Sequence, residues 1–230
     1  MRTIVISGAR KGIGRFLAEY YLARDYQVVG CSRSSSDLAH PRYKHFACDV
    51  TMEEEVLALF NILRNTCESI DVLINNAGVA SMNHSLLTPG STARKIIDTN
   101  FYGTFLMSRE CAKVMQLGKW GRIVNFVSVA LPLKLEGEAV YASSKAAVLT
   151  LTQILASEYA SFGITVNAVG PAPTETDLIR GVSEEKIAEL VQKQAIKRLG
   201  FFRDISNVVD FFISSLSDFV TGQVIYLGGV

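Results

Sequence analysis

The stretch TIVISGARKGIG, residues 3–14, joins a buried-strand pattern to a glycine-rich turn. Thr3–Ser7 is a short, mostly apolar run, and Gly14–Arg24 has the apolar spacing of an amphipathic helix. The glycines at 8, 12 and 14 permit a tight turn and a close approach of the backbone to a ligand. A plain strand-to-helix turn can hold the same glycines, but the order strand, glycine turn, helix is also that of a phosphate-binding helix N-terminus. A nucleoside-triphosphate P-loop is disfavoured, because no Gly-Lys-Ser/Thr follows.

The same alternation of short apolar runs and longer helical patterns continues along the chain. We expect further strands at Gln27–Cys31, Lys44–Cys48, Val72–Asn75, Arg122–Ser128, Ile164–Val169 and Val224–Leu227, and helical segments at Val56–Leu63, Ile96–Met115 and Ala139–Tyr159. Continuous apolar strands that alternate with helices predict an α/β fold with a parallel sheet covered on both faces. No linker-like, low-complexity or repeated segment divides the sequence, so we predict a single domain over residues 1–230 with about seven strands.

Composition argues against several other classes of protein. The formal net charge of +1 gives no support to a nucleic-acid partner. The four cysteines lack C-x-x-C spacing and the three histidines lack metal-ligand spacing, so we expect reduced, buried thiols and no metal site. The apolar run before Gly8 is too short for a signal-peptide core, and no uninterrupted apolar stretch approaches the length of a membrane span. We therefore expect a cytoplasmic protein with no membrane partner.

Later motifs follow the predicted strands at regular intervals. Asp49-Val50 follows the third strand, Asn75-Asn76-Ala77-Gly78 follows the fourth, and Tyr141-x-x-x-Lys145 opens the helix at 139–159. With the G-x-x-x-G-x-G turn, these motifs resemble the short-chain dehydrogenase/reductase family over essentially the full length. Within it, they most resemble the bacterial 3-oxoacyl-acyl-carrier-protein reductases. The resemblance implies a Rossmann-type, doubly wound sheet and an oxidoreductase that uses a nicotinamide cofactor.

Four residues form the expected catalytic set. Tyr141 and Lys145 are four apart, so on a helix they share one face. A tyrosine hydroxyl, with an ordinary pKa of about 10, becomes a better reversible acid when a neighbouring ammonium lowers that pKa. The resemblance implies that Tyr141 donates the proton, Lys145 lowers its pKa and binds the nicotinamide ribose, Ser128 binds the substrate carbonyl, and Asn100 supports a water chain. Singly, Ser128 could simply cap a strand end and Asn100 could be a structural polar residue.

The end of the second strand bears on the choice of cofactor. An acidic residue there selects NAD, whereas an arginine accepts the 2′-phosphate of NADP. Here the strand runs into Ser32-Arg33, and Asp37 lies further along the loop, where we expect it to be solvated. The planar fork of Arg33 suits a phosphate, so we predict NADP(H) and hence reduction. The expected cofactor-binding residues are Gly8, Arg10, Lys11, Gly12, Ile13, Gly14, Ser32, Arg33, Asp49, Val50, Asn76, Ala77, Gly78, Tyr141, Lys145, Pro171, Thr174 and Thr176.

Two departures from the family pattern concern the loops. Pro171-Ala172 stands where the family usually has Pro-Gly, and alanine narrows the backbone choices there. Reductases that use acyl carrier protein often have an arginine where this chain has Phe162, which leaves Lys119 as the other basic candidate. Docking of acyl carrier protein is therefore weakly supported, and a free small-molecule carbonyl is nearly as well supported.

The substrate itself is not determined by these patterns. We expect walls from residues 131–138 and 178–194, with apolar contributions from Leu131, Pro132, Leu133 and Leu135, and with Lys134 and Glu136 facing water. The leading hypothesis is NADPH-dependent reduction of a 3-oxoacyl-type or related ketone to a secondary alcohol. Oxidation or reduction of another alcohol (a sugar, a polyol or a steroid-like compound) is the first alternative, and a catalytically idle NADP-binding regulator is a second.

The resemblance also implies a homo-oligomer, either a tetramer or a dimer. We expect the helices at 96–115 and 139–159 to form its contacts, although a monomer would bury apolar helix faces too.

Overall fold

The fold is built on one parallel sheet. The computed structural model describes residues 1–174 and 183–230, and in these ranges it has seven strands in the order β3-β2-β1-β4-β5-β6-β7, with every neighbouring pair parallel. The strands are β1 (Thr3–Ser7), β2 (Gln27–Ser32), β3 (Tyr43–Ala47), β4 (Val72–Asn75), β5 (Gly121–Phe126), β6 (Ile164–Gly170) and β7 (Val224–Tyr226). The predicted α/β fold with a doubly wound, seven-stranded parallel sheet is confirmed.

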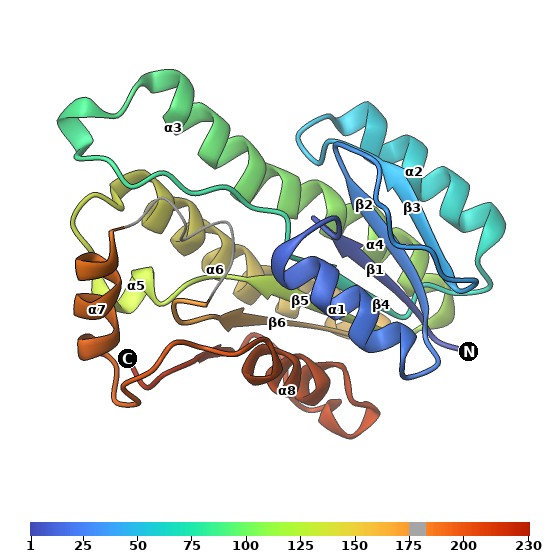
Figure 1. Ribbon diagram of the computed structural model, residues 1–230. Coiled ribbons are helices and arrows are strands. Elements are labelled where there is room, and N and C mark those ends of the chain that lie inside the picture. Colours follow the sequence, from blue (N-terminus) through green and yellow to red (C-terminus); the bar gives the residue numbers. More distant parts are fainter. Residues whose placement is uncertain (175–182) are drawn as a thin grey trace.

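Helices cover both faces of the sheet (Figure 1). α1 (Gly12–Leu22) and α8 (Phe202–Ile213) contact each other on one face, and α2 (Glu53–Thr66), α4 (Gly103–Gly118) and α6 (Ala139–Tyr159) cover the other. The shorter helices are α3 (Gly90–Ile97), α5 (Ala130–Leu133), α7 (Glu184–Lys193), the 3₁₀ turns Ser85–Leu87, Ala160–Phe162 and Ser215–Ser217, and the π-helix Asp98–Tyr102.

The strands are apolar throughout because each one is buried on both sides. In β1, Val5 packs into the core beneath α2, α4 and α6, whereas Ile4 and Ile6 pack into the core beneath α1 and α8. Successive side chains of a strand point to opposite faces, so a strand between two helical layers needs apolar residues at every position. This is the physical reason for the continuous apolar runs in the sequence.

The order of the strands places a crevice beside β1 and β4. From β1 the chain proceeds to β2 and β3 on one side, and β4 begins the series β5, β6 and β7 on the other. In doubly wound sheets, ligands bind at this switch point, beyond the carboxyl ends of the strands. The glycine turn follows β1 and Asn76 follows β4, so both motifs lie at the crevice.

Several element boundaries differ from the sequence predictions. The helix expected at 96–115 is α3, a π-helix and α4 in succession, and the strand expected to reach Ser128 ends at Phe126. α1 begins at Gly12 rather than Gly14, and α8 was not among the predicted helices.

Helix α6 and the turn after it, Ala139–Phe162, are long and apolar enough to cross a membrane by length and composition alone. In this fold the helix packs on β5 and β6, and Val148, Thr152 and Leu155 are buried. A helix of this length and composition is weak evidence for a membrane span, and the prediction of no membrane partner stays a prediction.

Cys31, Cys48 and Cys111 are buried as expected, Cys67 is half-buried, and all four are free thiols. Among the residues that the structure describes, no three His, Cys, Asp or Glu side chains are grouped as metal ligands would be.

Candidate active site

The glycine turn is shaped by close backbone contacts. Gly8 has a φ of +69°, a conformation that side chains disfavour, and a Cβ added to it would lie 2.9 Å from the Cα of Ala77. A Cβ on Gly14 would lie 2.4 Å from the carbonyl oxygen of Gly8. Lys11 is the N-cap residue of α1, and its side chain makes no capping hydrogen bond to the helix. The first N–H groups of α1 are therefore not satisfied by a side-chain cap, as a phosphate-binding helix N-terminus requires.

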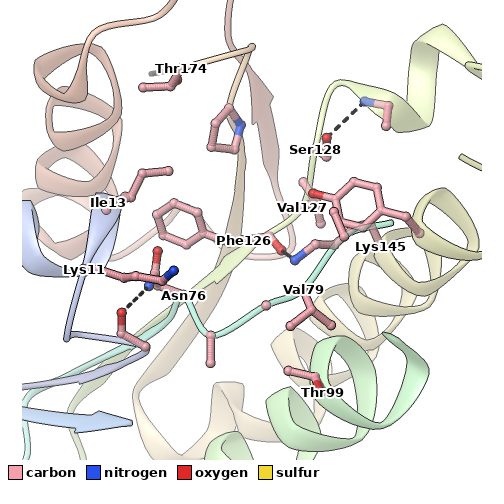
Figure 2. Close-up of a pocket in the computed structure, with 18 of the residues that line it drawn as sticks. Lys11, Ile13, Asn76, Val79, Thr99, Phe126, Val127, Ser128, Lys145 and Thr174 are labelled. Atoms are coloured by element: carbon pink, nitrogen blue, oxygen red, sulfur yellow. Dashed lines mark hydrogen bonds between the residues drawn. The ribbon is translucent and has the colours of Figure 1, made fainter. Parts of the chain in front are cut away.

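Asn76 joins the end of β4 to this turn. Its Nδ2 donates to the carbonyl oxygen of Gly8 (3.1 Å; Figure 2) and to that of Ser7 (3.0 Å), and the neighbouring Ala77 N–H donates to Ser7 Oγ (3.1 Å). The Asn-Asn-Ala-Gly motif thus holds the two sides of the crevice in one arrangement.

A cavity of about 540 Å³ runs from this turn to the start of α6. Most of the predicted site residues line it: Gly8, Arg10, Lys11, Gly12, Ile13, Ser32, Arg33, Asp49, Val50, Asn76, Ala77, Gly78, Ser128, Tyr141, Lys145, Pro171 and Thr174. Gly14 does not line it, because this buried glycine stands behind Asn76 and Gly8 and shapes the turn instead. Thr176 lies outside the described residues.

Tyr141 and Lys145 are brought together by the first turns of α6. Figure 2 shows Lys145 reaching toward the carbonyl oxygen of Phe126, to which its Nζ donates at 2.7 Å. The same Nζ lies 5.9 Å from the centroid of the Tyr141 ring. Burial lowers the pKa of Lys145 to about 8.

The pKa of Tyr141 differs from the sequence expectation. Burial raises it to about 12, the hydrogen bond with Ser128 lowers it, and the negative charge of Glu138 raises it. We expected Lys145 to lower the pKa of Tyr141, but in this structure desolvation of the phenol is the larger effect. The Tyr141 hydroxyl is consequently a protonated group at neutral pH.

Ser128 stands two residues beyond β5, half-buried at the wall of the cavity. Its Oγ accepts a hydrogen bond from the Ala130 N–H at 3.1 Å (Figure 2), which fixes the hydroxyl near Tyr141. One loop and one helix thus present two hydroxyl groups to the same point of the cavity, as the sequence predicts for a carbonyl-binding pair.

Asn100 lies in the π-helix, fully buried and outside the cavity lining. Its Oδ1 accepts from the Val79 N–H (2.8 Å), and its Nδ2 donates to Val79 O and Ser144 Oγ (2.9 Å each). Ser144 Oγ in turn donates to the carbonyl oxygen of Tyr141 (2.7 Å). The side chain of Asn100 therefore positions a cavity wall and the first turn of α6, which is the structural alternative left open by the sequence. Its support of a water chain stays a prediction.

The loop after β6 closes the far end of the cavity. Ala172 does not adopt a left-handed backbone conformation, so alanine fits where the family usually has glycine. Thr174 Oγ1 donates to Ala172 O at 2.9 Å, and Thr174 pairs with Gly200. A Cβ on Gly200 would lie 2.9 Å from Thr174 Oγ1, which explains the glycine after Arg198-Leu199.

The expected substrate walls are partly right. Leu135 lines the cavity, as do Ile187 and Leu190 of α7, and Lys134 and Glu136 are exposed. Leu131, Pro132 and Leu133 do not line it, because α5 turns them elsewhere. The part of the predicted wall at 178–182 lies outside the described residues.

Sequence reasoning missed one group at this site, the carbonyl oxygen of Phe126, a backbone atom that no side-chain motif reveals. Glu138 lies within the predicted wall at 131–138 and lines the cavity three residues before Tyr141, but no role of its own was predicted for it.

These features fit a nicotinamide dinucleotide: a glycine turn at a helix N-terminus begins the cavity, and a buried Tyr–Lys pair with a serine hydroxyl ends it. Together they define a dinucleotide-dependent oxidoreductase.

Comparison with known proteins gives the family. A family model described as enoyl-(acyl carrier protein) reductase matches residues 8–229. The chain is 32% identical over 231 residues to the 3-oxoacyl-[acyl-carrier-protein] reductase FabG of Vibrio harveyi, covering 98% of this chain and 95% of that protein.

Two solved structures are similar along nearly the whole chain. 4-Hydroxyisoleucine dehydrogenase complexed with NADH has a TM-score of 0.89 at 29% identity, covering 100% of this chain and 98% of that one. Ligand-free aldohexose dehydrogenase of Thermoplasma acidophilum has a TM-score of 0.91 at 30% identity, covering 99% and 93%. The chain belongs to the short-chain dehydrogenase/reductase family and is an oxidoreductase of CH–OH or carbonyl groups.

Proposed function

We propose that this enzyme uses NADPH to reduce a ketone, of the 3-oxoacyl type or a related small ketone, to a secondary alcohol. One observation carries the proposal. A single cavity joins Ser128, Tyr141 and Lys145 at one end to the basic residues Arg10 and Arg33 at the other. The first group suits a carbonyl, and the second suits the extra phosphate of NADP.

The position of Asp37, the acidic residue nearest in sequence to the end of β2, supports the preference for NADPH. Asp37 is 88% exposed and pairs with Arg15, with Nη1 and Oδ1 2.5 Å apart, and it does not line the cavity. Arg33 is exposed and lines the cavity beside Ser32 and Ser34. The hydrogen bond with Arg15 lowers the pKa of Asp37 and burial lowers that of His45, and the positive charge of Arg10 adds to both effects, so this charge also reaches this end. A 2′-phosphate therefore meets cations here rather than the carboxylate of Asp37.

The test of cofactor preference is Arg33→Ala. Hydrogen bonds to a charged group contribute about 1.5–3 kcal/mol, so we expect kcat/KM for NADPH to fall at least tenfold and that for NADH to change little. The measurement is absorbance at 340 nm with each cofactor. Arg64→Ala, an exposed change on α2, is the matched control. Equal or better use of NADH by the unmodified enzyme would refute the preference.

Each residue of the site has a part in the proposed reaction. A bound nicotinamide would supply the hydride to the carbonyl carbon. Ser128 holds the carbonyl oxygen with a hydrogen bond, and Tyr141 donates its proton to that oxygen as the alkoxide forms. Because the pKa of Tyr141 is raised to about 12, its hydroxyl carries the proton at neutral pH, which suits reduction. Lys145, whose Nζ is held by the carbonyl oxygen of Phe126, would bind the nicotinamide ribose with its ammonium group.

Tyr141→Phe tests this assignment. Loss of a positioned general acid reduces the rate by about 10²–10⁴-fold, so we expect kcat to fall by that factor while NADPH still binds. Turnover at 340 nm and fluorescence titration with NADPH measure the two effects. Near-normal turnover in this variant would show that another group supplies the proton.

Turnover of a panel of 3-oxoacyl thioesters, diketones and sugars, measured at 340 nm, tests which ketone is the substrate. Phe162 is 38% exposed and Lys119 is exposed nearby, which is a small basic surface for an acidic carrier protein. We therefore propose a free small-molecule substrate ahead of one bound to acyl carrier protein. The intact set of Ser128, Tyr141 and Lys145 in one cavity favours an enzyme over a catalytically idle regulator.

A further inference from the structure

A buried carboxyl oxygen at the start of α6 has no hydrogen-bond partner within the described part of the chain. Glu138 is 8% exposed and lines the cavity, and its Oε2 is buried with no hydrogen bond among the residues that the structure describes. Its backbone is fully used: the N–H donates to Leu135 O (3.3 Å), and the carbonyl oxygen accepts from the Ala142 N–H (2.7 Å). The hydrogen bonds of Glu138 at the start of α6 are therefore made by its backbone and not by its side chain.

Helix capping does not explain the residue. Glu138 occupies the N-cap position of α6, where short polar side chains commonly bond the first N–H groups. Its side chain makes no such bond. A buried acceptor without a partner costs about 1–3 kcal/mol, so the fold would be more stable with an apolar residue of similar size here.

The surroundings point to a ligand. The cavity that Glu138 lines also has the apolar side chains of Met82, Leu135, Ile187 and Leu190 in its wall. Among the described residues, the other acid that lines the cavity is Asp49. Its Oδ1 already accepts from the N–H and hydroxyl of Thr51, and it follows β3 at the cofactor end. Among the residues that the structure describes, Glu138 is thus the one carboxyl group that lines the cavity away from the cofactor end.

Glu138 is also close to the reacting atoms. It precedes Tyr141 by three residues, nearly one helical turn, and its charge acts on the Tyr141 hydroxyl. A carbonyl held by Ser128 and Tyr141 would place the next atoms of the substrate chain beside Glu138.

We propose that Glu138 accepts a hydrogen bond from a donor group, a hydroxyl or an ammonium, on the substrate carbon next to the reacting carbon. This inference rests on the proposed function and narrows its substrate class to ketones and alcohols that carry such a donor, at the expense of those without one, which include unsubstituted 3-oxoacyl chains. A site with a buried polar group rejects a substrate that leaves the group unpaired, because the desolvation is then not compensated.

Three alcohols of nearly equal shape test the inference: 2-butanol, 1,2-propanediol and 1-amino-2-propanol. They differ only in the group that the CH2 next to the carbinol carbon carries, which is a methyl, a hydroxyl or an ammonium. The measurement is kcat/KM for formation of NADPH from NADP⁺ at 340 nm. We expect the diol or the amino alcohol to exceed 2-butanol at least tenfold with the unmodified enzyme.

Two substitutions separate the possible donors. Glu138→Met removes the acceptor, so the preference should disappear while 2-butanol is oxidised at least as well as before. Glu138→Gln keeps a carbonyl oxygen but no charge, so a preference for the hydroxyl should survive largely intact and a preference for the ammonium should be lost. Glu158→Met, an exposed change at the far end of α6, is the matched control and should leave all three values unchanged.

The outcomes distinguish the two proposals. The role of Glu138 would be overturned if Glu138→Met kept the same preference among the three alcohols as the unmodified enzyme. It would also be overturned if the unmodified enzyme oxidised all three equally well. No turnover of any alcohol or ketone, by enzyme that binds NADPH and unfolds cooperatively, would instead overturn the proposed function.

Discussion

A single carboxyl group, that of Glu138, should give the protein a pH-dependent stability. Burial raises its pKa from the ordinary value of 4.5 to about 7. Over that range the folded protein holds a proton that the unfolded chain has lost. The free energy of unfolding therefore falls as pH rises through this window and stays lower above it. The effect has an upper limit of roughly 3 kcal/mol.

Glu138→Gln isolates this effect, since glutamine has nearly the same shape and does not titrate. We expect the free energy of unfolding of the variant to exceed that of the unmodified protein by about 1–3 kcal/mol at pH 8.5 and by clearly less at pH 5. Urea unfolding at the two pH values measures the difference, with Glu158→Gln as the exposed control. An equal gap at both pH values would show that Glu138 is ionised without penalty in the folded state.

At the scale of elements, the turn between β1 and α1 depends on the absence of side chains. Gly14 is packed against Gly8 and Asn76, whereas a Cβ on Gly90, the first residue of α3, would meet no atom within 4 Å. The two glycines are both helical, so they form a matched pair that differs in the space available.

Gly14→Ala should open the turn, because its Cβ would lie 2.4 Å from the Gly8 carbonyl oxygen and 2.5 Å from Asn76 Nδ2. We expect a loss of about 1–3 kcal/mol in stability and at least a tenfold loss in NADPH affinity. Gly90→Ala should be neutral or stabilising by about 0.4–1 kcal/mol. Thermal unfolding and NADPH fluorescence titration measure both effects. Equal stability and equal NADPH affinity of the two variants would mean that the turn can shift to accommodate the added methyl group.

The elements that were predictable are those with a pattern of their own. The strands read as apolar runs because both of their faces are buried, and the start of α6 with Tyr141 was placed correctly. The π-helix was missed because one extra residue in a turn hardly alters apolar spacing. α8 did carry a signal, since Ile205, Val209 and Phe212 repeat at helical intervals. The role of Glu138 could not be read from the sequence, because burial of a glutamate depends on segments far away in the chain.

At the scale of the whole molecule, large apolar side chains remain at the surface. Ile154 of α6 is 51% exposed, and Phe211, Leu216 and Phe219, near the end of α8, are 46%, 92% and 100% exposed. Such side chains are common at contacts between protein chains. They support the proposal of a homo-oligomer, in which α6 and the residues after α8 would form contacts.

Sedimentation velocity should therefore give a mass of two or four times the 25.2 kDa of one chain. Phe219→Asp places a charge on a fully exposed apolar position and should shift the distribution toward smaller species. Ile62→Asp on α2, a helix outside the expected contacts, is the control. A monomer at tens of micromolar would refute the oligomer, and an unchanged distribution in Phe219→Asp would exclude that residue from the contact.

The π-helix at Asp98–Tyr102 makes the number of residues in this segment as important as their identity. It holds one residue more than a regular helical turn, and that surplus aims Asn100 at Val79 and Ser144. An in-frame loss of one codon here would let the helix wind regularly and would remove the surplus that aims Asn100, with little rotation of α3 relative to α4. The contacts of Asn100 should therefore depend on the length of this segment as well as on its sequence.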